Sequence, residues 1–177
     1  MTSETARRRF SEQVLPHLDD AYSLARWLAG DATDAEDIVQ EACLRALKAL
    51  EAAPVERPRP WLLAVVRNAA YTWFARNRPR AIVLAGDAEE AQAHADALET
   101  GVSPSPEAAL IEAADRASVT TAIDDLPLAF KETLVMREIS GLSYRDISEA
   151  TGVPIGTVMS RLARARTLLI AKLGAAS

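Results

Sequence analysis

Residues 141–169, GLSYRDISEATGVPIGTVMSRLARARTLL, form the stretch that decides the fold. Ser143 can cap a helix that runs to about Thr151, and Gly152 can supply the left-handed turn after it. Pro154 prevents the first helix from continuing, so a second helix is expected to begin near Ile155. The two inner faces carry apolar residues at helical spacing, namely Tyr144, Ile147 and Ala150, then Val158, Leu162, Ala165 and Leu169. The pattern predicts a helix-turn-helix.

The outer face of the second helix is expected to present Thr157, Ser160, Arg161 and Arg164, with Arg166 close by. No acidic residue occurs from 155 to 177. Such a helix suits the major groove of DNA, where arginine can bind guanine and hydroxyl groups can reach bases or phosphates. The alternative is a solvated basic face on a core helix. The combined spacing of Ser148, Gly152 and Val158 favours the DNA-binding interpretation.

Composition indicates a soluble globular protein. The chain has 177 residues, of which 49% are hydrophobic and 25% charged. No apolar run approaches the roughly 20 residues of a membrane span, so no membrane insertion is expected. Cys43 is the single cysteine, which excludes an intramolecular disulfide and favours a cytoplasmic location. His17 and His94 have no neighbours typical of a metal site, so no metal or cofactor is expected.

The formal net charge of −5 is unevenly distributed along the chain. Residues 1–80 carry 12 basic and 11 acidic side chains, residues 81–127 carry 1 and 10, and residues 128–177 carry 7 and 4. Residues 57–86 contain no acidic residue. Six arginines and four aromatic side chains are interspersed in this stretch. Although the net charge is negative, the acidic residues are concentrated in the middle of the chain. The two end segments can therefore still bind nucleic acid.

The first part of the chain is expected to contain two helices after a disordered leader at residues 1–9. One is predicted over residues 10–29, with Tyr22 inside and Pro16 near its first turns. The next is expected to begin with a capping box of Thr33 and Glu36. Its outer face carries Asp37, Gln40, Glu41, Leu44 and Arg45. Periodicity alone favours a solvated face.

A proline-rich loop is predicted at residues 51–60, followed by a helix from Pro60 to about Asn77. The helix leaves a set of basic, amide and aromatic side chains outside its core face, namely Arg67, Asn68, Tyr71, Arg76 and Arg78. Aromatic rings beside arginines suit single-stranded DNA, because a ring can stack on an unpaired base and a cation can hold its phosphate. The alternative is that the aromatics are core and the arginines only solubilise.

Residues 81–105 are rich in Ala, acids, Ser and Pro, which is typical of a linker. Helices are expected at 106–124 and 126–139, each with a proline near its start. The sequence therefore predicts an all-α fold of two small helical domains, 10–80 and 106–174, joined by an acidic linker at 81–105.

Two motifs resemble a known family. GLSYRDISEATGVPIGTVMSRLARAR is similar to DNA-binding region 4 of bacterial RNA polymerase sigma factors of the extracytoplasmic-function (group IV) type. LPLAFKETLVMREISGLS resembles the lead-in to that region, and DAEDIVQEACLRAL resembles sigma region 2.2. Two positions depart from the pattern: Ser148 replaces a usual alanine, and Met159 stands where a basic residue is frequent.

The resemblance implies a sigma factor that binds core RNA polymerase and promoter DNA and catalyses nothing itself. It places core-polymerase contacts on Asp37, Gln40, Glu41, Leu44 and Arg45. It places minus-ten contacts on Arg67, Asn68, Tyr71, Arg76 and Arg78. It places minus-thirty-five contacts on Thr157, Ser160, Arg161 and Arg164. An anti-sigma protein is a further expected partner.

Two other functions remain open from the sequence. An ordinary helix-turn-helix regulator would bind DNA without polymerase, but such proteins normally dimerise and no dedicated dimerisation helix is apparent. A sigma-like decoy would bind an anti-sigma protein and never DNA. Retention of Arg161, Arg164 and the basic aromatic segment at 57–80 argues against the decoy.

Overall fold

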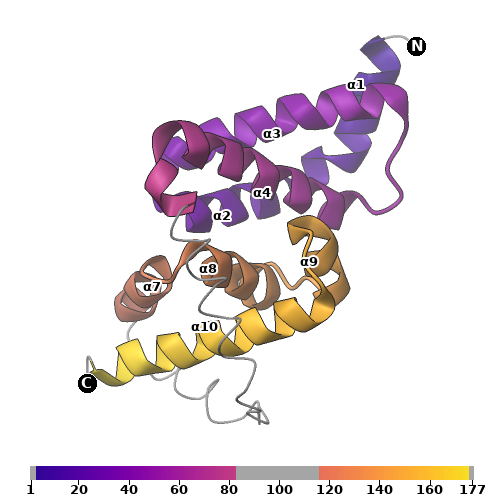
Figure 1. Cartoon of the computed structure of the whole chain (residues 1–177). Coiled ribbons are helices and arrows are strands. Elements are labelled where there is room, and N and C mark those ends of the chain that lie inside the picture. The colour runs from indigo at the N-terminus through magenta and orange to yellow at the C-terminus, as the bar shows by residue number, and fades with distance from the viewer. Residues whose placement is uncertain (1–2, 83–115, 176–177) are drawn as a thin grey trace.

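The computed structural model describes residues 3–82 and 116–175, and within these ranges the regular structure is entirely helical. Two groups of helices form two layers (Figure 1). The first group comprises α1 (Ser3–Gln13), the 3-10 turn η1 (Leu15–His17), α2 (Leu18–Ala29), α3 (Ala32–Ala52) and α4 (Pro58–Asn77). The second comprises α7 (Arg116–Asp124), α8 (Leu128–Leu134), the π-helical turn η2 (Val135–Ile139), α9 (Tyr144–Thr151) and α10 (Ile155–Ala175). The prediction of an all-α, two-domain fold is confirmed.

The N-terminal segment differs from the prediction. Residues 10–29 do not form one helix, because Pro16 lies in η1, which separates α1 from α2. Proline lacks the amide hydrogen that a continuous helix needs at that position. The expected disordered leader is also wrong from Ser3 onward: Ala6 is buried in α1, and Arg9 donates a hydrogen bond to the Leu50 carbonyl at 2.8 Å. These contacts tie α1 to α3.

The starts of α3 and α4 differ from the sequence prediction by a few residues. Asp31, rather than the predicted Thr33, caps α3 by accepting hydrogen bonds from the amides of Thr33 and Asp34 at 2.7 and 3.1 Å. A carboxylate there also suits the positive end of the helix dipole. α4 begins at Pro58, not Pro60. Tyr22, expected inside, is 37% exposed.

The helix-turn-helix is confirmed in its details. The Ser143 hydroxyl accepts from the amide of Asp146 at 3.1 Å, and Gly152 ends α9 with φ of 76°. The Ser148 hydroxyl donates to the Val153 carbonyl at 2.6 Å, which fixes the turn. Of the predicted helix at 106–124, residues 106–115 lie outside the described part of the chain. The predicted inner stripe of α10 is buried, namely Val158, Leu162, Ala165 and Leu169.

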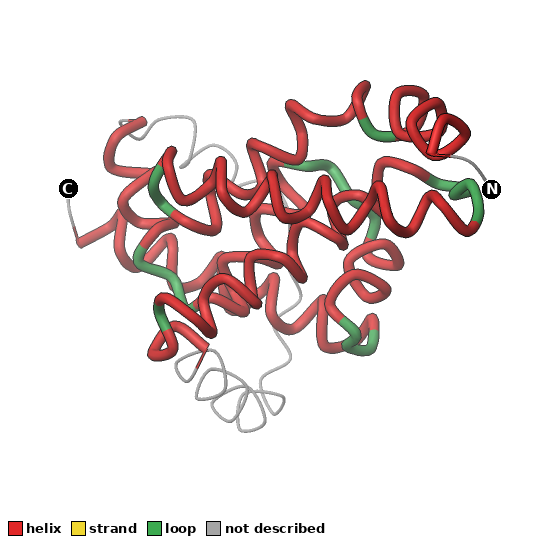
Figure 2. Tube along the Cα trace, turned by 90° about the horizontal axis from the view of Figure 1, so that it is seen from above, coloured by secondary structure: helices red, strands yellow, loops and turns green. Residues whose placement is uncertain are grey.

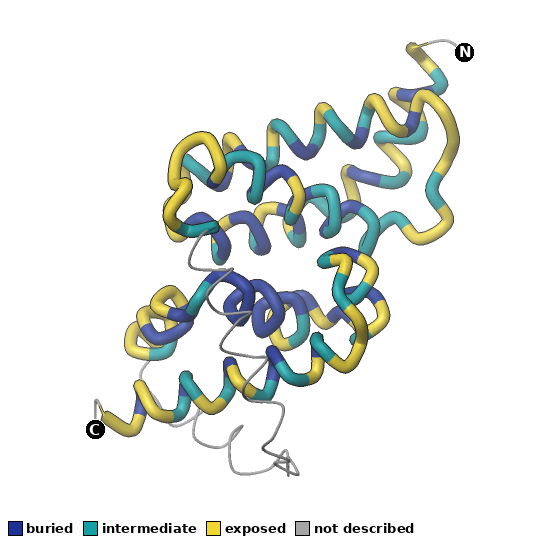
Figure 3. Tube along the Cα trace, viewed as in Figure 1, coloured by how far each residue is buried: buried dark blue, intermediate teal, exposed yellow. Residues whose placement is uncertain are grey.

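Helix α8 lies at the centre of the molecule. All seven of its residues are buried, including Lys131, Glu132 and Thr133 (Figure 3). It packs against α10 in its own layer and against α2 in the other. In the described part of the chain, short loops connect successive helices (Figure 2). The polar side chains of α8 are therefore positioned between the two domains.

Gly152→Ala should lower the free energy of unfolding by about 1 kcal/mol, because an alanine in the left-handed region meets its own backbone. No neighbouring atom lies within 4 Å of an added Cβ, so the cost is conformational alone. Urea unfolding followed by circular dichroism measures it. Gly156→Ala in α10 is the control, since it also adds a methyl group into open space but at a helical position, where alanine is favoured. Destabilisation of equal size in both variants would contradict the argument.

Candidate polymerase and nucleic-acid interfaces

The outer face of α3 is an exposed surface of acids and one large apolar side chain. Asp37, Gln40 and Leu44 are exposed, and Leu44 has 65% of its surface accessible. Glu41 and Arg45 form an ion pair of 2.9 Å beside them. A leucine this exposed buries only a minor part of its surface when the chain folds. The structure thus brings the five predicted polymerase contacts together on one face.

The predicted minus-ten residues of α4 fall into different environments. Arg67 binds the carboxylate of Glu132 through two hydrogen bonds, Nε–Oε2 of 2.8 Å and Nη2–Oε1 of 3.2 Å. Its guanidinium carbon also lies 3.8 Å from the centroid of the Tyr71 ring. Asn68 and Arg76 are exposed.

Tyr71 and Arg78, two further predicted minus-ten residues, also interact with other parts of the chain. Burial, with the neighbouring Glu132 carboxylate, raises the pKa of Tyr71, so its hydroxyl stays protonated. Arg78 is committed to the first domain, because it donates to the Ala29 carbonyl and to Asp34, both at 2.8 Å. Arg67 and Tyr71 are therefore interface residues in this conformation, and Asn68 and Arg76 are surface residues.

The face of α10 that carries the predicted DNA contacts is only partly exposed. Thr157 and Ser160 are half-buried and Arg164 is exposed. Arg161 is only 2% exposed, and its Nη1 lies 4.0 Å from Oε1 of Glu132. The prediction that Arg161 lies on the outer face is wrong here. Position 161 follows Val158 by three residues, and residues three or four apart share a helix face.

Two exposed apolar residues of α10 were missed. Ile155 is 45% exposed and Met159 is 53% exposed, one turn apart at the start of the helix. The available signal was their spacing of four residues, which places both on the same side of the helix. The outer face near the turn is therefore partly apolar, with Ser160 and Arg164 beside it.

Comparisons with known proteins match both helical groups in chain order. Residues 14–80 match the family described as Sigma-70 region 2, and residues 116–169 match Sigma-70, region 4. The chain is 34% identical over 155 residues to "ECF RNA polymerase sigma factor SigC" of Mycobacterium tuberculosis, covering 86% of this chain and 76% of that protein. The chain belongs to the extracytoplasmic-function sigma factors. Members of this family direct promoter-specific transcription.

Other comparisons extend the likeness of this sigma factor. It is 31% identical over 167 residues to SigE of Mycolicibacterium smegmatis, covering 94% of this chain but 62% of that protein's length. The fold also resembles the co-crystal structure of the sigma factor RpoE in complex with the anti-sigma factor NepR from Bartonella quintana. That match has a TM-score of 0.66 and 23% identity, and covers 93% of this chain and 96% of the other. None of the helices in the described ranges is long and apolar enough to cross a membrane.

In this sigma factor, arginines at the start of α4 bind the second domain. Arg57 forms a bidentate pair with Asp146 of α9, Nη1–Oδ1 of 2.7 Å and Nη2–Oδ2 of 3.2 Å. Arg59 donates to the Ser140 carbonyl and also pairs with Asp20 at 2.9 Å. Burial alone would raise the pKa of the Asp146 carboxyl group. The hydrogen bonds with Arg57 and Ser143 outweigh burial, so the pKa lies below its usual value and the carboxylate is ionised at neutral pH. Sequence reasoning missed Glu132 and Asp146, whose partners lie far away in the chain.

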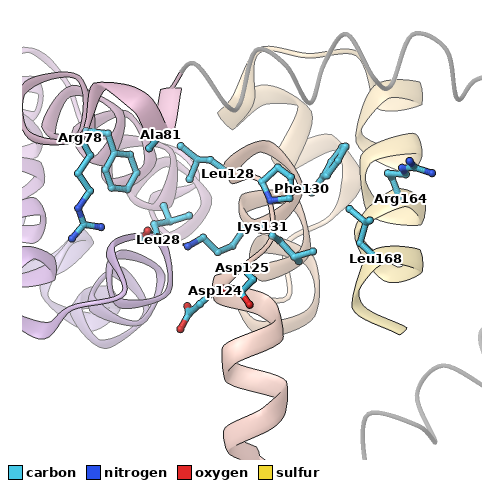
Figure 4. Close-up of a pocket in the computed structure, with 13 residues that line it drawn as sticks. Leu28, Arg78, Ala81, Asp124, Asp125, Leu128, Phe130, Lys131, Arg164 and Leu168 are labelled. Atoms are coloured by element: carbon cyan, nitrogen blue, oxygen red, sulfur yellow. Dashed lines mark hydrogen bonds between the residues drawn. The ribbon is translucent and has the colours of Figure 1, made fainter. Parts of the chain in front are cut away.

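A cavity of about 650 Å³ lies between the domains of the sigma factor at the other end of the interface (Figure 4). Apolar side chains from both domains line it, together with the charged residues Arg78, Asp124, Asp125, Lys131 and Arg164. The Lys131 ammonium points toward the Leu28 carbonyl, 3.5 Å away, and burial lowers its pKa. The apolar packing between the domains is thus incomplete at this end.

Proposed function

We propose that this chain binds core RNA polymerase through its first domain and recognises promoters through both domains, without catalysing a reaction itself. The proposal rests on two features that occur together in one chain. The helix-turn-helix exposes Arg164, and the first domain exposes Leu44 beside acidic residues. Polymerase would supply the chemistry of RNA synthesis. A cytoplasmic location follows from that partner.

We infer that the outer face of α3 is the polymerase-docking surface. Exposed Leu44 gives it an apolar centre, and Asp37, Gln40 and the Glu41–Arg45 pair give it a polar rim. An apolar centre within a polar rim is the usual anatomy of a protein interface. The surface is accessible while the two domains are packed together, so docking requires no prior rearrangement.

Leu44→Ala should weaken binding to core polymerase by at least tenfold while leaving the free energy of unfolding nearly unchanged, because most of the Leu44 side chain lies outside the core and is available to a partner. Gln40→Ala should have a smaller effect in the same direction. Fluorescence titration of labelled protein with core polymerase measures both. The control is Lys48→Ala, an exposed residue one turn farther along the same helix. If the Leu44 and Lys48 variants bind core polymerase with equal affinity, this face is only a solvent-exposed surface and not a docking site.

The domain predicted at 10–80 is proposed to capture the melted minus-ten strand on α4. Asn68 can pair with a base edge, Tyr71 can stack on a base, and Arg67 and Arg76 can hold phosphates. Arg78 is proposed for the same surface, although two hydrogen bonds commit it to α2 and α3 in the free chain.

The domain predicted at 106–174 is proposed to read duplex minus-thirty-five DNA with the start of α10. Arg164, Ser160 and Thr157 lie on or near its accessible side. Arg161 is proposed to position this helix through Glu132 rather than to touch a base, because it is buried beside that carboxylate. The linker predicted at 81–105 would set the spacing of the two DNA elements.

An anti-sigma protein is the further partner proposed, because the structurally similar RpoE was crystallised in complex with the anti-sigma factor NepR. The proposed function as a whole is tested by run-off transcription with core polymerase on genomic DNA. The alternative, a regulator acting without polymerase, predicts binding of free protein to duplex promoter in a gel shift. A sigma factor should bind such a duplex poorly until core polymerase is added.

A further inference from the structure

We propose that Met159, with Ile155 beside it, reads a thymine of duplex promoter DNA through the 5-methyl group of the base, at a base pair other than the one that Arg164 contacts. The inference rests on the proposed function, in which the start of α10 reads the minus-thirty-five element. It adds an apolar contact to a face whose predicted contacts were hydroxyl groups and arginines.

The two side chains form an apolar strip at the N-terminal end of α10. Ile155 is the first residue of the helix and is 45% exposed, and Met159 is 53% exposed. Side chains four residues apart on a helix are neighbours, with Cβ atoms about 5–6 Å apart. Among the exposed large apolar side chains of residues 3–82 and 116–175, these two are the pair separated by a single helical turn. Single exposed apolar residues are ordinary, whereas an adjacent pair is a contact surface.

The strip lies at the end of α10 that a helix-turn-helix inserts into DNA. α10 packs on α7, α8 and α9, and α8 and α9 lie between it and the first domain (Figure 1). The turn before it is fixed by the hydrogen bond from the Ser148 hydroxyl to the Val153 carbonyl at 2.6 Å. In helix-turn-helix proteins the N-terminal residues of the second helix contact base edges in the major groove. Ile155 and Met159 occupy that position.

The charge around the strip matches nucleic acid. Residues 155–177 contain no acid, and Arg164 is exposed on the same helix. The amide groups at the start of a helix also favour an anion such as phosphate. The phosphates on both sides of a groove are therefore attracted to the surroundings of the strip, while the strip itself faces the bases.

The chemistry of the two side chains selects thymine. In the major groove the bases present nitrogen, oxygen and amino groups, and the 5-methyl group of thymine is the apolar feature. Cytosine presents an amino donor there, and an alkyl side chain pressed against it would leave that donor without a partner. Met159 has a flexible thioether chain that can follow the position of a methyl group, and Ile155 is stiff at χ1 and limits where Met159 can go.

The helix geometry separates this thymine from the base that Arg164 contacts. At roughly 100° and 1.5 Å per residue, Met159 and Arg164 lie about 140° apart around the axis of α10 and about 7.5 Å apart along it. Base pairs are spaced by about 3.4 Å. Ser160 lies between the two flanks, and its hydroxyl donates to the Gly156 carbonyl at 3.0 Å. The apolar flank and the basic flank therefore reach different base pairs.

Replacing thymine by deoxyuridine tests the inference, because it removes the 5-methyl group and leaves base pairing intact. The full chain bound to core polymerase is titrated with promoter duplexes in which each thymine of the minus-thirty-five element, on either strand, is replaced singly. We expect about fourfold weaker binding at one or two positions, the effect of burying one methyl group. Met159→Ala should abolish most of this methyl dependence.

Ile139→Ala is the matched control, because Ile139 is also an exposed apolar residue of the second domain, 41% accessible, but lies in η2 and outside α10. It should keep the methyl dependence of the wild type. Thermal unfolding checks that both variants are folded. Met159→Arg exchanges the apolar contact for a cation, so it should lose the methyl dependence and steepen the decrease of affinity with salt by about one phosphate contact.

Three results would overturn the thymine contact. They are the absence of any deoxyuridine effect, equal methyl dependence of wild type and Met159→Ala, and methyl dependence retained in Met159→Arg. Weaker binding of Met159→Ala to core polymerase without promoter, with the methyl dependence unchanged, would assign the strip to a protein partner instead. The proposed function fails separately, when no base-pair substitution in the minus-thirty-five element changes the affinity of the wild-type complex, because α10 then reads no base.

Discussion

Arg161→Ala should lower the free energy of unfolding by about 3 kcal/mol, the cost of removing one partner from a buried charge pair. The side chain is 3% exposed and lies beside Glu132, which has no exposed surface. Alanine removes one cation from beside that carboxylate and leaves a void in the interior of the second domain. Urea denaturation followed by circular dichroism measures the loss.

Arg164→Ala is the matched control for stability, because it removes the same side chain three residues later from an exposed position. Exposed substitutions of this kind usually change stability by less than about 0.5 kcal/mol. The Arg161 variant should also lower transcription from all promoters by one factor, since fewer molecules are folded. Near-equal stability of the two variants, with promoter-dependent transcription for Arg161→Ala, would instead make Arg161 a base-reading residue.

Arg161 also shows where sequence reasoning reached its limit. The helix-turn-helix itself was predictable, because Ser143, Gly152 and Pro154 act on their own backbone neighbours. Whether an arginine of α10 faces the solvent or the core depends on how the helix packs against the rest of the domain. Polar residues are usually outside, whereas Arg161 is inside, beside a buried carboxylate that Glu132 offers from another helix. Its three-residue spacing from Val158 was the sole local indication.

The same distinction applies to the first domain. Helical periodicity places Ile38, Ala42, Ala46 and Leu50 on one face of α3, and all four are buried. The break at Pro16 is a local signal, since a proline six residues after Phe10 removes a backbone hydrogen bond from a continuous helix. The Arg57–Asp146 contact spans 89 residues of sequence and follows no periodic pattern. Packing of one domain on the other therefore needed the three-dimensional structure.

Arg164→Ala should reduce transcription from the cognate promoter at least tenfold with the fold intact. Arg164 is exposed on the accessible side of α10, one turn after Ser160. A guanidinium that forks onto guanine contributes about 1 to 3 kcal/mol of discrimination against other bases. Run-off transcription with saturating core polymerase measures the loss without a contribution from polymerase affinity.

Lys172→Ala is the charge-matched control, because Lys172 lies on the same helix near its C-terminal end and pairs with Asp125 at 3.4 Å. Both variants remove one positive charge, so a general loss of phosphate attraction would affect them alike. Promoters altered singly along the minus-thirty-five element separate base from backbone contact. Loss of the wild-type preference at one base pair identifies the base that Arg164 reads, whereas an equal decrease on every promoter would show a phosphate contact. Unchanged transcription would contradict the proposed recognition face of α10, because Arg164 is its most accessible basic group.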